Sequence, residues 1–141
     1  MLLMKRYADA IPYLERSIRI KPGVGKVHYN LGMALAHTPG RESGAIDEYQ
    51  AALRFNPDND LAHNNLGLLL LKQGRTADAL FHFAEAVRLH PDYGCERNLG
   101  DTRATIPGKE SETIAHLEAA YRFIPDPTIL PTIERLRQAR K

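Results

Sequence analysis

The sequence predicts an all-α protein, a solenoid in which antiparallel helix pairs stack one on the next. Two kinds of residue mark a common period along the 141 residues, and each period has room for two helices. Prolines recur at intervals of 35, 34 and 34 residues, at Pro22, Pro57, Pro91 and Pro125. Glycines recur at intervals of 34 and 34 residues, at Gly40, Gly74 and Gly108. Such units bury their apolar faces only against neighbours, which favours a stack over a single globular core.

Each period reads as two helices. In the period that starts at residue 58, Leu66, Leu69 and Leu70 follow the three- and four-residue steps of an amphipathic helix. Gly74 can close this helix because glycine adopts the positive φ that a helix C-terminus often needs. A second apolar stripe then follows, made of Ala79, Leu80, Phe83, Ala86 and Val87. Pro91 ends the period because proline cannot continue a helix.

Neighbouring periods share residues as well as spacing. The run Tyr29-Asn30-Leu31-Gly32 corresponds to Asn64-Asn65-Leu66-Gly67, and a third Leu-Gly pair is Leu99-Gly100. In the second helices, Ala45, Tyr49 and Pro57 correspond to Ala79, Phe83 and Pro91. This pattern resembles the tetratricopeptide repeat over nearly the whole chain. The resemblance implies a right-handed α-α superhelix (solenoid) of stacked antiparallel helix pairs, whose first helices line the concave face.

The period divides the chain into units of one continuous solenoid domain. We expect a partial first repeat at 1–22 (second helix only), repeats at 23–57 and 58–91, a degenerate repeat at 92–125 and a capping helix at 126–141. The extra residue in Thr38-Pro39-Gly40 predicts a wider turn there. The fourth unit is degenerate because Arg103 and Thr113 stand where other repeats have leucine and alanine.

The N-terminal unit lacks most of a first helix. With an offset of 69 residues, Met1 to Lys5 align with Leu70 to Gly74, the end of a first helix. We therefore expect an uncovered apolar face around Ile11, Leu14 and Ile18. This interpretation makes the chain the C-terminal part of a longer repeat array, or a module that forms a homo-oligomer through its N-terminal face.

Composition narrows the classes of partner. The formal net charge is +2, from 19 Lys plus Arg against 17 Asp plus Glu, and it is spread along the chain. Nucleic-acid binding is not expected, because no basic stripe could neutralise many phosphates. The apolar run from Leu66 to Leu71 is too short for membrane insertion. Cys95 is the only cysteine, which fits a reducing compartment and favours a cytoplasmic location.

Three asparagines precede the Leu-Gly pairs: Asn30, Asn65 and Asn98. In register on the concave face they form a ladder whose amides can donate to and accept from an extended peptide backbone. The ladder resembles the one in the superhelical domain of O-linked N-acetylglucosamine transferases. The alternative is that asparagine is common at this position and makes no contact with a partner. The other candidate groove residues are the flanking Tyr29 and Asn64 and, one turn away, Lys26, Met33, Leu68, Arg97 and Asp101.

A different peptide-binding mode is not expected. Chaperone-binding members of the family hold a C-terminal carboxylate with a clamp of lysine, asparagine and arginine. Asn65 fits that pattern, but Tyr29, Met33 and Gly94 stand where the clamp needs lysine or asparagine. The sequence therefore favours a groove that is apolar in the middle and charged at both ends.

Catalysis, metals and cofactors are not expected. The six histidines occupy equivalent positions in different repeats, where stacked helices lie about 8–10 Å apart. Zinc–nitrogen bonds are about 2 Å, so in-register histidines alone cannot share an ion. Cys95 falls on an apolar stripe, and the glycines are explained by turns and helix contacts rather than by phosphate binding.

Two classes of function follow. The first is a protein–protein interaction scaffold that binds an extended peptide or protein segment in the concave groove. The alternative is the non-catalytic, substrate-recruiting tail of a larger enzyme such as a glycosyltransferase. Self-association through the open N-terminal end is a third possibility.

Overall fold

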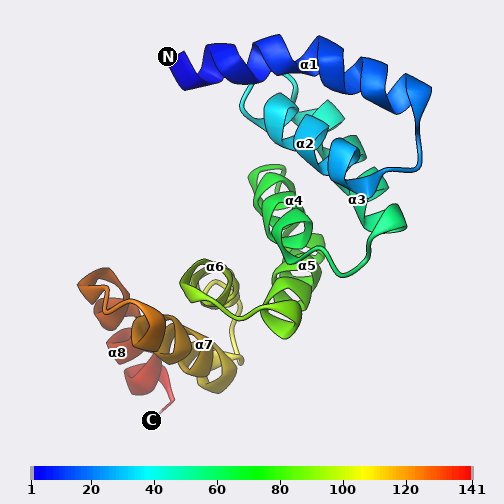
Figure 1. The fold of residues 1–141 in the computed structure, drawn as a ribbon. Coiled ribbons are helices and arrows are strands. Elements are labelled where there is room, and N and C mark those ends of the chain that lie inside the picture. The colour runs from blue at the N-terminus through cyan, green and yellow to red at the C-terminus, as the bar shows by residue number, and fades with distance from the viewer. Residues whose placement is uncertain (1, 141) are drawn as a thin grey trace.

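A computed structural model describes residues 2–140, which form α-helices, one short 3-10 helix and no strand. The chain curves into an open arc with α1 at one end and α8 at the other (Figure 1). The elements, in order, are α1 Leu2–Ile20, α2 Gly25–Ala36, α3 Glu42–Phe55, α4 Asp60–Lys72, α5 Thr76–Leu89, α6 Tyr93–Arg103, α7 Glu110–Phe123, the 3-10 helix η1 Pro127–Ile129 and α8 Leu130–Ala139. This arrangement confirms the predicted all-α superhelix.

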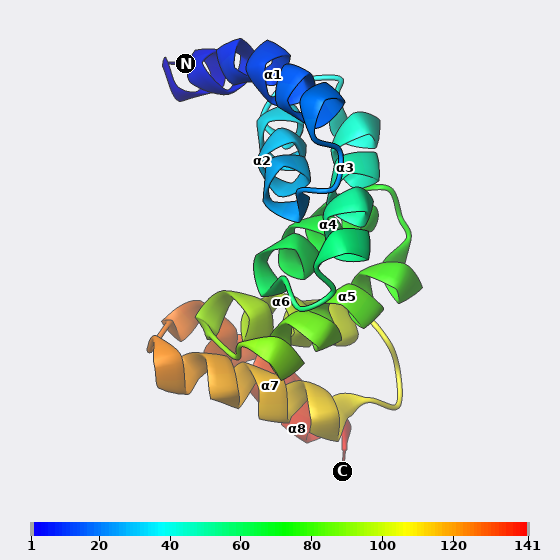
Figure 2. The same cartoon turned by 45° about the vertical axis from the view of Figure 1, so that its right-hand side comes forward.

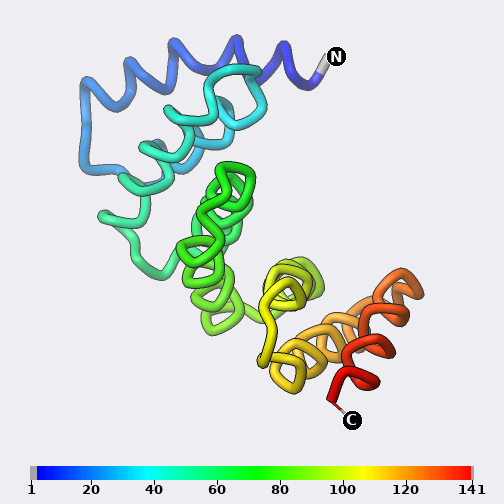
Figure 3. Tube along the Cα trace, turned by 180° about the vertical axis from the view of Figure 1, so that it is seen from behind, coloured from blue at the N-terminus to red at the C-terminus, as the bar shows by residue number. Residues whose placement is uncertain are grey.

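Helix pairs are the building blocks of the arc. Helix α2 packs on α3, α4 on α5 and α6 on α7, and neighbouring pairs meet through α3–α4 and α5–α6. Helix α1 covers one end by packing on α2, and α8 covers the other by packing on α7 (Figure 2). Helices α2, α4 and α6 lie toward the open side of the arc, with α3 and α5 behind them (Figures 1 and 3).

A glycine in the first helix of each pair lets the two helices approach closely. A Cβ built on Gly67 would lie 2.6 Å from Cε1 of Phe83, and one on Gly100 would lie 2.6 Å from Cδ2 of Leu117. The same construction on Gly32 reaches Cδ1 of Tyr49 at 2.9 Å. All three distances are shorter than a carbon–carbon contact allows. The glycine of every Leu-Gly pair is therefore required by packing.

The turns within the helix pairs share a second glycine. Gly40, Gly74 and Gly108 have φ values of 77°, 75° and 81°. After α4, Gly74 donates to the carbonyl of Leu71 and Arg75 donates to the carbonyl of Leu70, both at 3.0 Å, which caps the helix in a Schellman motif. The α2–α3 turn covers residues 37–41 and the α4–α5 turn residues 73–75, so the first turn is wider, as the inserted residue predicts.

A polar pair links the two helices of every pair at one register. Its members stand three residues before the Leu-Gly glycine's leucine and three residues after the small residue of the second helix. The nitrogen–oxygen or nitrogen–nitrogen distances are 2.7 Å for His28–Glu48, 2.9 Å for His63–His82 and 2.6 Å for Glu96–His116. The histidines predicted to be packing residues thus hold helix pairs together.

The fourth unit departs from the others, as its sequence predicts. Thr113 is fully buried in an alanine position, and its hydroxyl donates to the carbonyl of Lys109 at 2.7 Å. Arg103 forms an ion pair with Glu112 at 2.7 Å at the end of α6. The buried apolar residues accordingly form two clusters, one spanning α1 to α6 and one made by α7, η1 and α8.

The expectation for the N-terminal helix is wrong in two respects. No turn follows Lys5, because α1 is one helix and the sequence has lysine where Gly74 ends α4. Ile11 is only 7% exposed, and Leu14 and Ile18 are half-buried against the main cluster. These residues face α2, the first helix of the next repeat. A second helix contacts two first helices, and the sequence-based argument considered only its own.

The close approach at Gly67 predicts opposite effects for two identical substitutions. Gly67→Ala should destabilise the protein by about 1–3 kcal/mol, because its methyl group would overlap the rigid ring of Phe83. Gly44→Ala, also within a helix, should be neutral or stabilise by up to about 1 kcal/mol, because its Cβ would meet Leu35 only at 3.4 Å. Urea unfolding of both variants checks this, and stabilisation by Gly67→Ala would refute the packing argument.

The His63–His82 pair predicts sensitivity to acid. His63 Nε2 donates to the carbonyl of Pro57 at 2.9 Å, so its Nδ1 accepts from Nδ1–H of His82. Burial, and then the neighbouring His63, lower the pKa of His82 to about 4; Asp78 and Glu85 raise it, and Arg75 lowers it. An unfolded histidine has a pKa of about 6.5. Because the folded pKa is the lower one, the contribution is complete above about pH 6.5 and is lost as pH falls toward 4.

His82→Gln keeps a donor for His63 but cannot be protonated in this range. Its melting temperature should therefore fall less between about pH 7 and pH 5 than that of the wild type. His90→Gln, at the exposed end of the same helix, should retain the acid sensitivity of the wild type. Differential scanning calorimetry across this pH range makes the comparison. Equal sensitivity in the wild type and His82→Gln would remove His82 as a cause.

Candidate peptide-binding groove

A hollow of about 460 Å³ lies between α2 and α4, on the open side of the arc. Its walls come from positions three or four residues apart, so they share one face of each helix. The side chain of Tyr49, fully buried behind α2 and α4, forms its floor. Its lining residues are Met33, Ala36, His37, Tyr49, Asn65, Leu68, Leu69 and Lys72. The hollow therefore combines an apolar centre with one amide and one ammonium group.

A second hollow, of about 350 Å³, continues from the first between α1 and α2. Met33 lines both hollows. Tyr7 of this second hollow stacks on His37 of the first, with ring centroids 4.4 Å apart. The second hollow is lined by Tyr7, Ala10, Tyr13, Leu14, Asn30, Met33 and Ala34. Its α1 residues were absent from the predicted site, although the 69-residue offset could have placed them beside a first helix.

The asparagine ladder is present, but two of its amides already have partners. Asn98 Nδ2 donates to Oδ1 of Asn64 at 2.9 Å, and Asn65 Nδ2 donates to the hydroxyl of Tyr29 at 3.4 Å. Both bonds join the first helix of one repeat to that of the preceding repeat. The expectation of amides with few internal contacts is thus wrong for Asn98 and only partly met by Asn65, whose bond is long. No side-chain hydrogen bond involves Asn30 within residues 2–140.

The predicted charged end of the groove is occupied by internal contacts. Arg97 Nε donates to Asp101 at 3.1 Å, while its Nη1 donates to the hydroxyl of Tyr93 at 2.6 Å and to Asp126. Tyr93 in turn donates to Asp126 at 2.5 Å. These bonds, with those from Thr128, hold the pKa of Asp126 far below its usual range. Arg97 and Asp101 therefore tie α6 to the start of the cap. Lys26 is exposed and lines neither hollow.

A third hollow, of about 490 Å³, lies where α4, α6 and the end of α7 meet. It contains Asn64 of the predicted site, beside Leu61 and Phe123, which are about half exposed. Cys95 lines it from a buried position, and burial, with nearby Asp92, raises the pKa of its thiol to about 12. A thiol with that pKa is a poor nucleophile at neutral pH.

Two searches of the described residues concern other classes of site. Within residues 2–140, no group of three His, Cys, Asp or Glu side chains is placed to hold a metal ion. None of the helices there is long and apolar enough to cross a membrane.

Comparison with family descriptions and curated proteins points to one family. Residues 40–74 match the family described as "TPR repeat", and residues 60–93 match "Tetratricopeptide repeat". BBSome complex member BBS4 of Bos taurus is 33% identical over 77 residues, which are 55% of this chain and 15% of that protein. Photosystem I assembly protein Ycf3 of Synechococcus sp. (strain CC9311) is 32% identical over 75 residues, 51% of this chain and 43% of that protein. The chain thus spans less than half of either relative.

Solved structures of several proteins share the fold. MamA residues 41 to the end, from Desulfovibrio magneticus RS-1, align with a TM-score of 0.80 at 20% identity, over 98% of this chain and 81% of that one. PilF of Pseudomonas aeruginosa gives 0.79 at 22%, over 99% and 64%. YrrB, described as a TPR protein with an unusual peptide-binding site, gives 0.75 at 23%, over 95% and 69%.

The period, the paired helices, the glycine contacts and both family matches agree with one another. We conclude that the chain is a tetratricopeptide repeat protein.

Proposed function

We propose that the hollow between α2 and α4 binds an extended, mainly apolar segment of a partner protein. The coarser function, a protein-interaction scaffold, rests on the repeat family and on its solved relatives. The observation that carries the finer proposal is the apolar centre of this hollow, where Met33 and Leu68 reach solvent from adjacent first helices. The peptide-binding site of YrrB and the complex or assembly roles in the names of BBS4 and Ycf3 agree with it.

The polar groups around Met33 and Leu68 specify the segment further. Asn30 and Asn65 stand on adjacent first helices, one turn before Met33 and Leu68, and each can bond to a partner backbone. Lys72 stands one turn beyond Leu68 and takes part in no ion pair within residues 2–140. A segment with an acidic residue beside its apolar anchor would therefore suit the hollow.

Asn98, Arg97 and Asp101 take a structural role in this proposal. Their polar atoms join α6 to α4 and to the start of the cap, so a partner would have to break those bonds to use them. Two other hypotheses from the sequence, a recruiting tail of a larger enzyme and self-association at the N-terminal end, stay predictions.

Two acidic substitutions test the hollow. A peptide is first selected from a random library on the wild-type protein, and its affinity is then measured by isothermal titration calorimetry. Leu68→Glu should weaken binding at least tenfold, because a carboxylate would lose water when the apolar segment covers it. Phe81→Glu makes a comparable change at a convex residue that is more exposed, 61% against 38%, and should leave affinity unchanged. Equal affinities for the two variants would refute the site.

The asparagines should separate into two groups. Asn30→Ala should weaken the same peptide by about 0.5–1.5 kcal/mol, the net value of one hydrogen bond, without lowering stability. Asn98→Ala should leave affinity unchanged but lower the free energy of unfolding by a similar amount, because Asn64 loses its partner. Titration and urea unfolding of both variants give the two readouts. If Asn98→Ala weakened binding and Asn30→Ala did not, this division of roles would be wrong.

A further inference from the structure

Three second helices bury the same series of residues, small, large and small, against their own first helices. All nine side chains are at most 1% exposed. The large residue in each series is the one that contacts the glycine of the Leu-Gly pair. The series are Ala45, Tyr49 and Ala52 on α3, Ala79, Phe83 and Ala86 on α5, and Thr113, Leu117 and Ala120 on α7.

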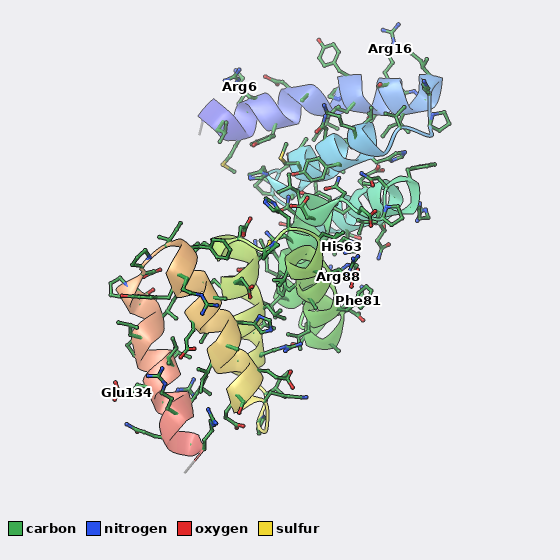
Figure 4. All side chains as sticks on the ribbon, turned by 60° about the horizontal axis from the view of Figure 1, so that its bottom comes forward. Arg6, Arg16, His63, Phe81, Arg88 and Glu134 are labelled. Carbon is green, nitrogen blue, oxygen red and sulfur yellow. The ribbon has the colours of Figure 1, made fainter. Side chains whose placement is uncertain are left out.

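Helix α1 carries the same series without a helix to cover it. Ala10, Leu14 and Ser17 stand 35 residues before Ala45, Tyr49 and Ala52. All three α1 residues remain half-buried, and Ala10 and Leu14 line the hollow of about 350 Å³ between α1 and α2. Tyr13 at its edge is 77% exposed. Helix α1 is the outermost helix at its end of the arc, and Arg6 and Arg16 project from its outer side (Figure 4).

Charge gives the missing helix a direction. In the α4–α5 pair, Asp60 at the start of the first helix bonds to His90, just after the second helix, at 3.2 Å. The residue equivalent to His90, 69 positions earlier, is Lys21. Near the start of the second helices, Asp78 of α5 is equivalent to Asp9 of α1. No side chain of α1, nor Lys21, takes part in an ion pair within residues 2–140.

We propose that the hollow between α1 and α2 is a docking site for one amphipathic α-helix of a partner protein. The helix lies antiparallel to α1 and begins with an acidic residue beside Lys21. It presents glycine or alanine to Leu14, because the equivalent Leu117 leaves no room for a side chain on Gly100. This site differs from the groove of the proposed function in position and in the conformation of its ligand.

A second copy of this chain is the poorer occupant. Helix α1 carries four cationic side chains against two carboxylates, and α8 at the other end carries Arg135 and Arg137 against Glu134. Stacking of either end on α1 would bring like charges together. An acidic partner helix instead meets cations that have no ion-pair partner in this chain.

The probe is a labelled synthetic peptide with the sequence of residues 58–74, which covers the equivalent face of α5. Fluorescence anisotropy measures its binding to the whole chain. Ala10→Lys and Ala8→Lys add the same charge to the same helix, but only Ala10 lines the hollow, whereas Ala8 is exposed. Ala10→Lys should weaken binding at least tenfold, and Ala8→Lys by less than twofold. A peptide carrying Gly67→Leu should also bind at least tenfold more weakly to the wild type.

Four outcomes would overturn the proposal. These are equal binding by the two lysine variants, full affinity of the Gly67→Leu peptide, no binding of the probe by the wild type at roughly 1 mM, and dimers in sedimentation that Ala10→Lys abolishes, which would identify a second copy as the occupant. Circular dichroism checks that Ala10→Lys remains folded. If it does not, Ser17→Arg, which blocks the same face, provides the comparison.

Discussion

The close contact between a glycine in each first helix and a large side chain in each second helix is the constraint on which this structure depends. The ring of Phe83 and the side chain of Leu117 occupy the volume that a Cβ on Gly67 or Gly100 would need. This contact fixes how near the two helices lie. Every other interaction within a pair, including the buried alanines and the polar pair one turn away, requires that separation.

The same contact explains how the solenoid tolerates variation. Tyr49, Phe83 and Leu117 differ in size, yet each lies against a glycine and each is almost completely buried. Polar residues enter only where a local bond satisfies them, as the Thr113 hydroxyl does with a backbone carbonyl. Beyond the helix pairs the constraints are looser, and the apolar core divides where Arg103 takes the place of a leucine.

The fold was predictable because its markers are local. Proline spacing, the turn glycines and the Leu-Gly pairs each act within one helix or turn, so their positions alone indicate helix pairs. The candidate site was less predictable. The register placed Met33, Asn65 and Leu68 together correctly on adjacent first helices. It could not show that Asn98 and Arg97 bond to side chains in other helices, since those partners depend on side-chain conformations in three dimensions. Tyr7 and Tyr13 were missed because α1 was judged by the face it turns to α2.

The polar pairs also bear on which helices can associate while the chain folds. His28 faces Glu48 in the first pair, whereas in the last pair the carboxylate belongs to the first helix, as Glu96, and the histidine to the second. Repeats so similar in sequence can exchange partners, within one molecule or between molecules. A hairpin formed wrongly from α6 and α3 would bring Glu96 against Glu48 in a half-buried site, where two carboxylates repel each other. The reversed order of acid and base thus discriminates against one mispaired intermediate that the glycine contacts alone would accept.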